Sequence, residues 1–184
     1  MRVNRFPLSA AGLISVILLA SASSSYSVAQ EQLTLLVPGA PWSLVLPKGG
    51  FDMQPAKISP DGKQGSFSAS DKAAGLNVSF FVEPASKCHS SRECRDMVQK
   101  AGFARMGTVE NISASELGDV SIVECFVPEF KGAPVKQQHL FAEFVVQGYW
   151  VDMHVSKVLY KQADRALLEA LVRSVSFSPR EKAQ

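Results

Sequence analysis

The sequence has 184 residues, of which 46% are hydrophobic and 20% are charged, and its formal net charge at pH 7 is +2. The whole of that excess comes from Arg2 and Arg5, so residues 30–184 carry 17 basic and 17 acidic side chains. Binding to nucleic acid or to an anionic membrane surface needs a basic excess. The composition therefore argues against both kinds of partner, and we expect no nucleic-acid ligand.

The first 29 residues have the three parts of a secretory signal peptide. A basic start precedes an apolar run over residues 8–22, and Ser27-Val28-Ala29 suits cleavage by signal peptidase. An uncleaved membrane anchor is the alternative, but the apolar run is short for a span, which needs about 20 residues. We therefore expect a secreted or periplasmic protein that keeps no membrane span after cleavage.

The rest of the chain predicts one domain, residues 30–178, with a polar tail at residues 179–184. Strand patterns are predicted at residues 33–37, 42–46, 65–70, 76–82, 106–112, 120–127 and 174–178. Pro, Gly and Lys predict a surface loop over residues 51–65, and residues 128–134 read as a polar connector.

Residues 138–156 predict one long β-hairpin around a turn at Gln147-Gly148, because Gly148 allows the positive φ that tight hairpin turns need. One face then pairs only apolar residues: Val146 with Tyr149, Phe144 with Val151, Ala142 with Met153 and Leu140 with Val155. The other face is mixed: Val145 pairs with Trp150, Glu143 with Asp152, Phe141 with His154 and His139 with Ser156. A slip of one residue would exchange the faces, so the pattern predicts the register and places the apolar face in a core.

Two helices are predicted, one before and one after the central strands in sequence order. The first spans residues 90–103, with Ser90 and Glu93 as a capping box. Its predicted buried stripe is Cys94, Met97, Val98 and Ala101. The second spans residues 160–173, with a predicted buried stripe of Ala163, Ala166, Leu167, Ala170 and Leu171. Strand pairs joined by short turns, with two helices, predict an α+β fold built on an antiparallel sheet.

Residues 42–51 read Trp-Ser-Leu-Val-Leu-Pro-Lys-Gly-Gly-Phe, and the long hairpin leads into a helix and a final Val175-x-Phe177 strand. This order resembles the PsbP-like superfamily, whose domains open on a strand followed by Pro, Gly and an aromatic residue. The resemblance covers residues 33–177 and implies an α/β/α sandwich in an exported bacterial member. It also implies a role in binding partners rather than in catalysis, and it carries over no functional residue.

Four side chains on the mixed face are candidate metal ligands: His139, Glu143, Asp152 and His154. Imidazole and carboxylate groups bind divalent ions where three or four of them converge. Two carboxylates directly opposite each other destabilise a sheet slightly, which favours either a bound cation or a nearby lysine. The alternative is that the carboxylates are exposed and the histidines lie at an edge of the sheet.

Three apolar side chains, Phe141, Val145 and Trp150, share the same mixed face. If no helix covered them, they would form an exposed patch and a binding surface for a partner. We expect them instead to pack beneath the second helix.

Three cysteines follow the signal peptide: Cys88, Cys94 and Cys125. Their spacings match no zinc pattern, and export permits a disulfide. Proximity favours a Cys88–Cys94 bond at the start of the first helix, with Cys94–Cys125 across helix and sheet as the alternative.

The sequence contains no Gly-x-Ser-x-Gly elbow, and we find no motif for a cofactor. We therefore expect no cofactor, and a non-catalytic binding or accessory domain that acts on a protein or an envelope component. The alternative is a metal-binding protein or metal-dependent enzyme that uses the mixed face of the hairpin.

Overall fold

The structure, a computed structural model, describes residues 31–37 and 39–180. The predicted signal peptide and the last four residues of the predicted tail lie outside the described residues. Within those described, no helix is both long enough and apolar enough to cross a membrane.

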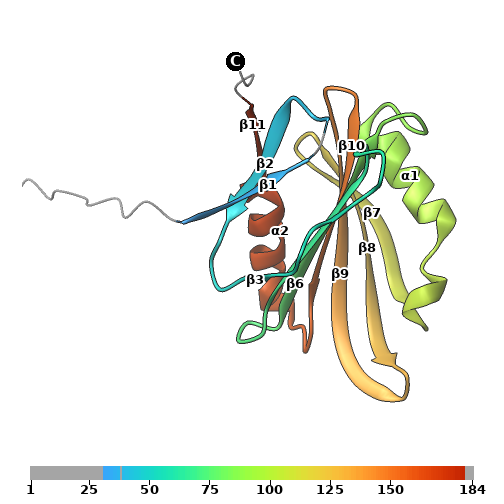
Figure 1. Cartoon of the computed structure of the whole chain (residues 1–184). Coiled ribbons are helices and arrows are strands. Elements are labelled where there is room, and N and C mark those ends of the chain that lie inside the picture. The colour runs from blue at the N-terminus through green and yellow to red at the C-terminus, as the bar shows by residue number, and fades with distance from the viewer. Residues whose placement is uncertain (1–30, 38, 181–184) are drawn as a thin grey trace, which may run out of the picture.

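Two antiparallel sheets and two α-helices make up the described chain, which confirms the α+β prediction (Figure 1). The larger sheet has eight strands in the spatial order β3-β5-β6-β10-β9-β8-β7, and β4 pairs with β5. Its strands are β3 (Asp52–Met53), β4 (Lys57–Ile58), β5 (Gly65–Asp71), β6 (Leu76–Pro84), β7 (Glu110–Leu117), β8 (Val120–Phe130), β9 (Ala133–Val146) and β10 (Tyr149–Lys157). The smaller sheet has the order β1-β2-β11 and contains β1 (Gln32–Leu36), β2 (Trp42–Pro47) and β11 (Ser176–Pro179).

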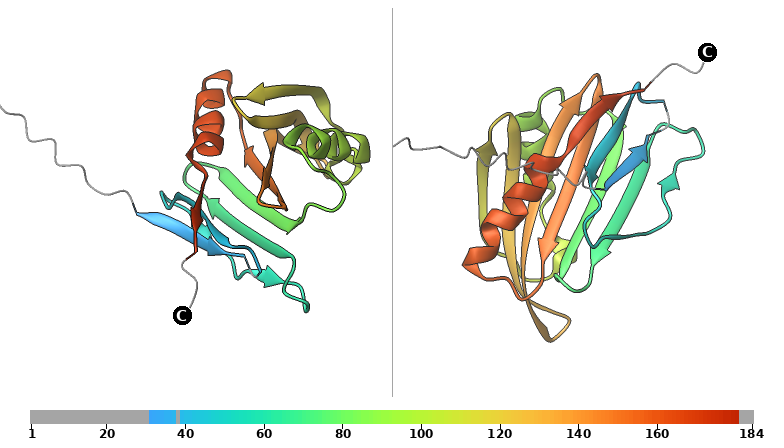
Figure 2. Two further views of the ribbon diagram at one scale, coloured as in Figure 1. Left: turned by 90° about the horizontal axis from the view of Figure 1, so that it is seen from above. Right: turned by 90° about the vertical axis from the view of Figure 1, so that its left-hand side faces the viewer.

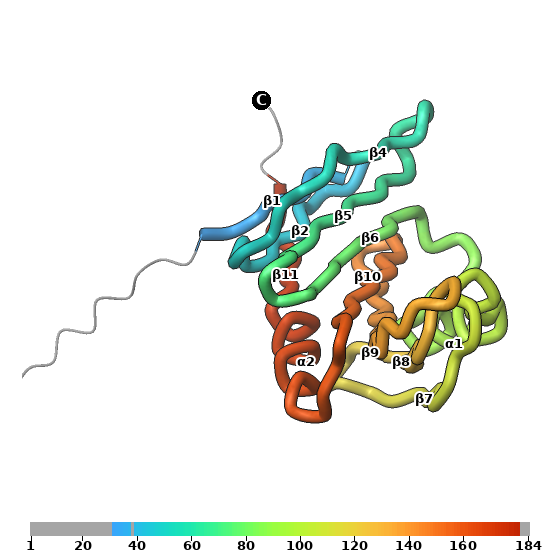
Figure 3. The backbone as a smooth tube through the Cα atoms, turned by 90° about the horizontal axis from the view of Figure 1, so that it is seen from below, coloured from blue at the N-terminus to red at the C-terminus, as the bar shows by residue number. Residues whose placement is uncertain are grey.

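The two α-helices lie on opposite faces of the larger sheet. Helix α1 (Ser91–Ala101) packs on β8 and β9, whereas α2 (Arg165–Ser174) packs on β10 and β2 (Figure 3). The smaller sheet lies on the same side as α2 (Figure 2). The main core is therefore enclosed between the larger sheet on one side and the smaller sheet with α2 on the other, which makes the fold a sandwich.

The predicted hairpin is present as β9 and β10, and the pairing of its residues is the predicted one. Gln147 and Gly148 occupy the turn with φ values of 47° and 80°, as a two-residue turn of this hand requires. Leu140, Ala142, Met153 and Val155 are fully buried on the apolar face, and Phe144 is 9% exposed. Alternation of side chains along two paired strands was sufficient to predict this part of the core.

Helix α1 covers the Trp150 end of the mixed face of the hairpin, and the prediction that the second helix covers this face is wrong. Trp150 is 8% exposed and packs with the two cysteines of the first helix region, Cys88 and Cys94. The reason is the path of the chain. Trp150 pairs across to Glu83 near the end of β6, so the segment that leaves β6 passes directly over the indole before α1 begins.

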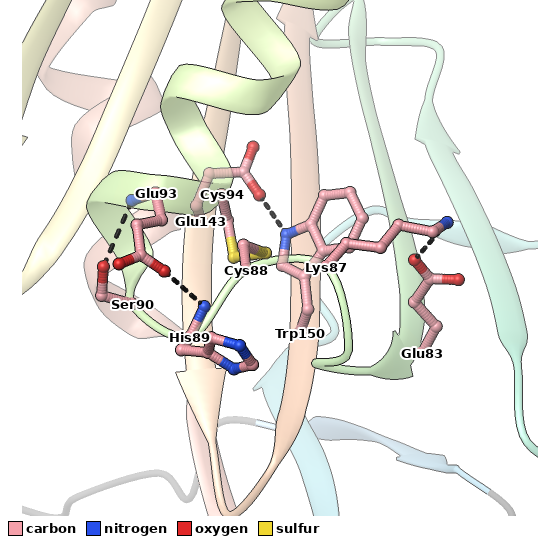
Figure 4. The surroundings of a disulfide bond; sticks show 9 residues. All are labelled: Glu83, Lys87, Cys88, His89, Ser90, Glu93, Cys94, Glu143 and Trp150. Carbon is pink, nitrogen blue, oxygen red and sulfur yellow. Dashed lines mark hydrogen bonds and ion pairs between the residues drawn. A yellow bond between two sulfur atoms is a disulfide. The ribbon is translucent and has the colours of Figure 1, made fainter.

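Helix α1 begins where the sequence predicts. Ser90 is its N-cap, and its side chain accepts a hydrogen bond of 3.2 Å from the N–H of Glu93. The Glu93 carboxylate accepts the N–H of His89 at 2.7 Å, one residue before the position of a standard capping box (Figure 4). Of the predicted buried stripe, Cys94 is buried, Met97 and Val98 are half-buried, and Ala101 is exposed.

A disulfide joins Cys88 to Cys94, as proximity in the sequence favoured (Figure 4). Cys125 is buried in β8 and forms no disulfide within the described residues. The bond ties the segment before α1 to its first turn, above Trp150.

Replacing both bonded cysteines by serine should lower the free energy of unfolding by about 2 kcal/mol, because the bond closes only a short loop. Urea unfolding of the oxidised protein and the Cys88→Ser, Cys94→Ser variant measures the difference. Cys125→Ser is a poor control because its thiol is buried, so the wild type treated with a reductant serves instead. Equal stability of the oxidised and reduced wild type would contradict the expectation.

Several predicted boundaries are wrong for identifiable reasons. Of the predicted strand at 106–112, only residues 110–112 are strand, because Met106 ends a 3-10 turn, η1 (Ala104–Met106), and β7 begins at Glu110. The predicted loop at 51–65 contains the two short edge strands β3 and β4. The predicted connector at 128–134 continues β8 and β9 around a turn at Lys131-Gly132. Pro128 is tolerated there because the register shifts between Val127 and Glu129, where a missing N–H breaks no ladder bond.

The second helix presents a different face from the one predicted. A 3-10 turn, η2 (Gln162–Asp164), precedes it, and α2 buries Leu168 and Val172. Four residues of the predicted stripe are exposed, Ala163, Ala166, Leu167 and Ala170, and Leu171 is half-buried. Arg165 is the first residue of α2 and is ion-paired to Glu124 of the sheet, so it fixes which side of the helix faces inward.

Glu124 is 8% exposed and joins three elements through its carboxylate. One oxygen accepts the hydroxyl of Ser113 at 3.0 Å. The other accepts the Gln138 amide at 3.1 Å and the guanidinium of Arg165. Arg165 also contacts Glu169 one turn further along α2, at 2.8 Å. The network docks the start of α2 on the larger sheet.

The variant Glu124→Ala should lower the free energy of unfolding by about 2 kcal/mol, since it leaves Gln138 and Arg165 without a buried partner. Glu169→Ala removes the other carboxylate of Arg165 at a more exposed position and should cost less than about 0.5 kcal/mol. Thermal unfolding of the two variants at pH 7 distinguishes them. Losses of similar size would mean that the buried carboxylate does not anchor α2.

Candidate functional site

Two adjoining cavities open on the α1 face of the larger sheet, beyond the last turn of α1. The first, which we call the helix-end cavity, has a volume of about 460 Å³. It is lined by Val98, Ala101, Gly102, Phe103, Ala104, Arg105, Met106, Phe141 and Asp152. The second, the histidine cavity, has a volume of about 410 Å³. It is lined by Arg105, Met106, Val127, Phe130, Gln137, His139, Phe141 and His154.

The wall between the cavities is formed by η1 and Phe141. Gly102 ends α1 with a φ of 74°, and Gly107 follows η1 with a φ of 84°, so the turn folds back over the sheet between two left-handed glycines. Phe103 is 7% exposed, and its ring centroid lies 5.2 Å from that of Phe141. These contacts hold Arg105 and Met106 at the edge of both cavities.

The two histidines of the hairpin form a hydrogen-bonded pair in the floor of the histidine cavity. His139 Nδ1 and His154 Nε2 are 2.8 Å apart. The ring of His154 stacks on Phe141 with centroids 4.3 Å apart. Burial lowers the pKa of His139 to about 3, with a further contribution from His154, and burial lowers the pKa of His154 to about 4. Both imidazoles are therefore neutral at pH 7.

The two carboxyl groups of the hairpin form a second pair. Glu143 is fully buried in β9 directly opposite Asp152 in β10, and Trp150 Nε1 donates a hydrogen bond of 2.6 Å to Glu143 Oε2 (Figure 4). Glu143 Oε1 and Asp152 Oδ1 are shut off from solvent and have no hydrogen-bond partner among the described residues. One proton held between these groups would supply the donor that both oxygens lack.

Burial sets the charge of the carboxyl pair. Burial, with a further contribution from the charge of Asp152, raises the pKa of Glu143 to about 9, while the hydrogen bond from the Trp150 N–H opposes the shift. Burial also raises the pKa of Asp152, to about 6. At pH 7 the pair therefore holds one proton and one negative charge.

The four predicted metal ligands fall into these two pairs, one of histidines and one of carboxyl groups. In the described part of the chain, no group of three or more His, Cys, Asp or Glu side chains is placed to hold a metal ion. The structure thus brings the predicted residues together two by two and does not gather them into one centre.

The three predicted patch residues are also separated. Trp150 lies beneath α1 with Val145 beside it, whereas half-buried Phe141 lines both cavities. The sequence did not indicate Phe103, Arg105 and Met106 as site residues, because Phe103 read as the end of the first helix and Met106 as the start of a strand, with Arg105 between them. A turn between Gly102 and Gly107 was the available signal.

A smaller cavity of about 250 Å³, lined mostly by polar residues, extends the site beyond His154. It lies over the open part of β5 and β6 and is lined by Gln54, Ser68, Ala69, Ser70, Asn77, Val78, Ser79 and His154. His154 lines this cavity as well as the histidine cavity. The α1 face therefore presents a polar region beside two largely apolar cavities.

Comparison with protein-family models and with curated proteins gives no match for this sequence.

Proposed function

We propose that this protein is an exported, non-catalytic binding domain that takes part of an envelope component or a partner protein into the cavities beside η1. The observation that supports this most directly is the pair of adjoining cavities, which share Arg105, Met106 and Phe141. Each has the volume of a typical small-molecule site, largely apolar with a few polar groups. A ligand there would contact aromatic rings on a sheet whose side chains are already fixed by packing.

Export is supported by two independent features. The sequence begins with the basic, apolar and small-residue regions of a signal peptide. The Cys88–Cys94 disulfide lies at the start of α1, with exposures of 2% and 0% for the two residues. Structural disulfides persist in oxidising compartments such as the periplasm or the extracellular space.

Binding fits the two histidines of the site better than acid–base catalysis does. A general base works best when its pKa is near the working pH. The pKa values of His139 and His154 are far below neutrality, and both rings are engaged with each other or with Phe141.

We also propose membership in the PsbP-like superfamily. Its support is the sandwich order, with a long antiparallel hairpin followed by a helix and a last short strand, β11, that pairs with β2. Members of that superfamily act mainly through binding, which agrees with the role proposed here.

The proposal is tested by filling the shared wall of the two cavities. We expect Met106→Trp to abolish binding of the component that the wild type retains from an envelope extract, as observed by native mass spectrometry. Leu159→Trp adds the same indole at a residue that is 65% exposed and should leave binding intact. Retention of the same bound mass by Met106→Trp, with an unchanged circular dichroism spectrum, would refute the location of the site.

Calorimetry with Zn²⁺ tests the metal-dependent alternative. Micromolar binding that is lost in a His154→Ala, Asp152→Ala double variant would favour a metal-binding function over the one proposed. We expect no such binding, because three or four ligands must converge on zinc and the described residues provide two separate pairs.

A further inference from the structure

The helix-end cavity combines three features that each favour a positive charge. The first is the C-terminal end of α1, whose residues Val98, Ala101 and Gly102 form part of its lining. The last carbonyl groups of a helix carry a partial negative charge, which stabilises a cation within about one turn of the helix end.

The second feature is Asp152 in the lining of the same cavity. It lies directly opposite Glu143 in the hairpin, and Asp152 Oδ1 and Glu143 Oε1 are buried without a hydrogen-bond partner among the described residues. Within residues 31–37 and 39–180, no lysine or arginine forms an ion pair with either carboxyl group. Among the hydrogen bonds of the described residues, the one side-chain donor to the pair is the neutral indole N–H of Trp150, which is bonded to Glu143. A buried charge in this state is stabilised by a cation that reaches it from the cavity.

The third feature is the aromatic and aliphatic wall. Phe103 and Phe141 lie side by side with their rings inclined by 31°, and half-buried Met106 and Val98 pack against the same cluster. The faces of aromatic rings attract cations, and they also accept an apolar stem. The wall therefore selects a cation with an apolar body over a fully hydrated metal ion.

We propose that the helix-end cavity binds an organic cation, an ammonium group on an apolar or aromatic stem, with the ammonium at Asp152 and the stem against Phe103, Phe141 and Met106. This proposal deepens the binding function proposed above by naming the ligand class, and it rests on that function.

Arg105 is the one basic residue in the lining of this cavity. Its side chain is exposed and forms no ion pair with the described residues. A positive charge at the rim opposes entry of a second one. We therefore expect Arg105→Ala to tighten binding of an ammonium ligand and to weaken binding of a carboxylate ligand.

The experiment compares three probes of similar shape: phenethylammonium, the neutral phenethyl alcohol and the anionic phenylpropionate. Binding to the mature protein at pH 7 is followed by NMR, using the backbone signals of residues 101–106 and 152. Asp152→Asn removes the charge with little change of shape. Asp119→Asn removes a charge at an exposed residue outside the cavity lining and is the matched control.

We expect phenethylammonium to bind more tightly than the other two probes. Asp152→Asn should weaken its binding by about tenfold, the effect of one hydrogen bond to a charged group, and Asp119→Asn should leave it unchanged. Equal affinity for the ammonium and the alcohol, tighter binding of phenylpropionate, or no saturable binding of phenethylammonium would each overturn the proposal.

The outcomes separate this inference from the function on which it rests. If the alcohol binds at residues 101–106 as tightly as the ammonium, the cavity is a binding site and only the cation preference is wrong. If Met106→Trp retains the component bound from the envelope extract, the proposed location of the binding function is wrong, whatever the probes do.

Discussion

Raising the pH from 6.5 to 9 should lower the free energy of unfolding of this protein by about 3 kcal/mol, with the buried carboxyl group of Glu143 as the cause. The pKa of this group is about 9 in the folded protein, against an ordinary value of 4.5. Between those two values the folded state holds a proton that the unfolded state has released. Its stabilising effect is fully present below pH 4.5 and is lost as the pH rises through the folded pKa.

The slope follows from the number of protons involved. One proton held only by the folded state lowers the unfolding free energy by about 1.4 kcal/mol for each pH unit. Asp152 acts in the same direction but only up to its folded pKa of about 6. Above pH 6.5, Glu143 therefore dominates the dependence.

The histidine pair has the opposite effect at lower pH. The folded pKa values of His139 and His154, about 3 and 4, lie below the ordinary value of 6.5, so the unfolded chain takes up protons there that the folded one does not. Their contribution to stability is present above pH 6.5 and is lost as the pH falls. Between pH 4.5 and 6 the two pairs oppose each other, and we expect a plateau of stability there.

Urea unfolding at intervals from pH 4.5 to 9 measures the profile. Glu143→Gln keeps the shape of the side chain and cannot lose a proton, so it should flatten the slope above pH 6.5. Glu169→Gln changes the same group at a partly exposed site on α2 and should keep the wild-type slope. A Glu143→Gln profile that runs parallel to the wild type would show that Glu143 is ionised at neutral pH.

The same pairs show how far the sequence could predict the site. Alternation along β9 and β10 placed His139 and His154, and Glu143 and Asp152, as near neighbours on one face. It could not show that Trp150 donates a hydrogen bond to Glu143 or that the side chains of both pairs are largely buried. That depends on α1, which packs there because β6 ends beside Trp150. A contact between elements distant in sequence leaves no periodic signal in either of them.

The turn that forms the cavity wall was missed for a different reason. Residues 106–112 read as a strand, but only 110–112 belong to one, because Gly102 and Gly107 adopt positive φ values that reverse the chain first. The apolar residues Met106, Val109 and Ile112 recur every three positions, so no strand alternation supported the prediction against two glycines in such turns. The central hairpin was predictable because its alternation continues over both arms and agrees with one turn.

Leu168→Ala should lower the free energy of unfolding by about 3 kcal/mol, whereas Leu167→Ala at the next position should cost less than about 1 kcal/mol. Leu168 is fully buried between α2 and the sheets, and Leu167 is 44% exposed. The periodicity of the sequence favoured Leu167, since Ala163, Ala166 and Ala170 share its side of an ideal helix. Small alanines carry little information about which side is buried, and the ion pair of Arg165 with Glu124 turns the other side inward.

Thermal unfolding of the two alanine variants at pH 6 decides between the two faces, because the substitution is identical and the sites are adjacent. A larger loss for Leu167→Ala would show that α2 is rotated relative to the structure described here. The Glu124 network would then point away from Arg165, and Glu124→Ala would no longer destabilise the docking of α2. The results for the leucine variants and for Glu124→Ala therefore have to agree. Glu124 orients α2 through Arg165, and that orientation buries the apolar surface of Leu168.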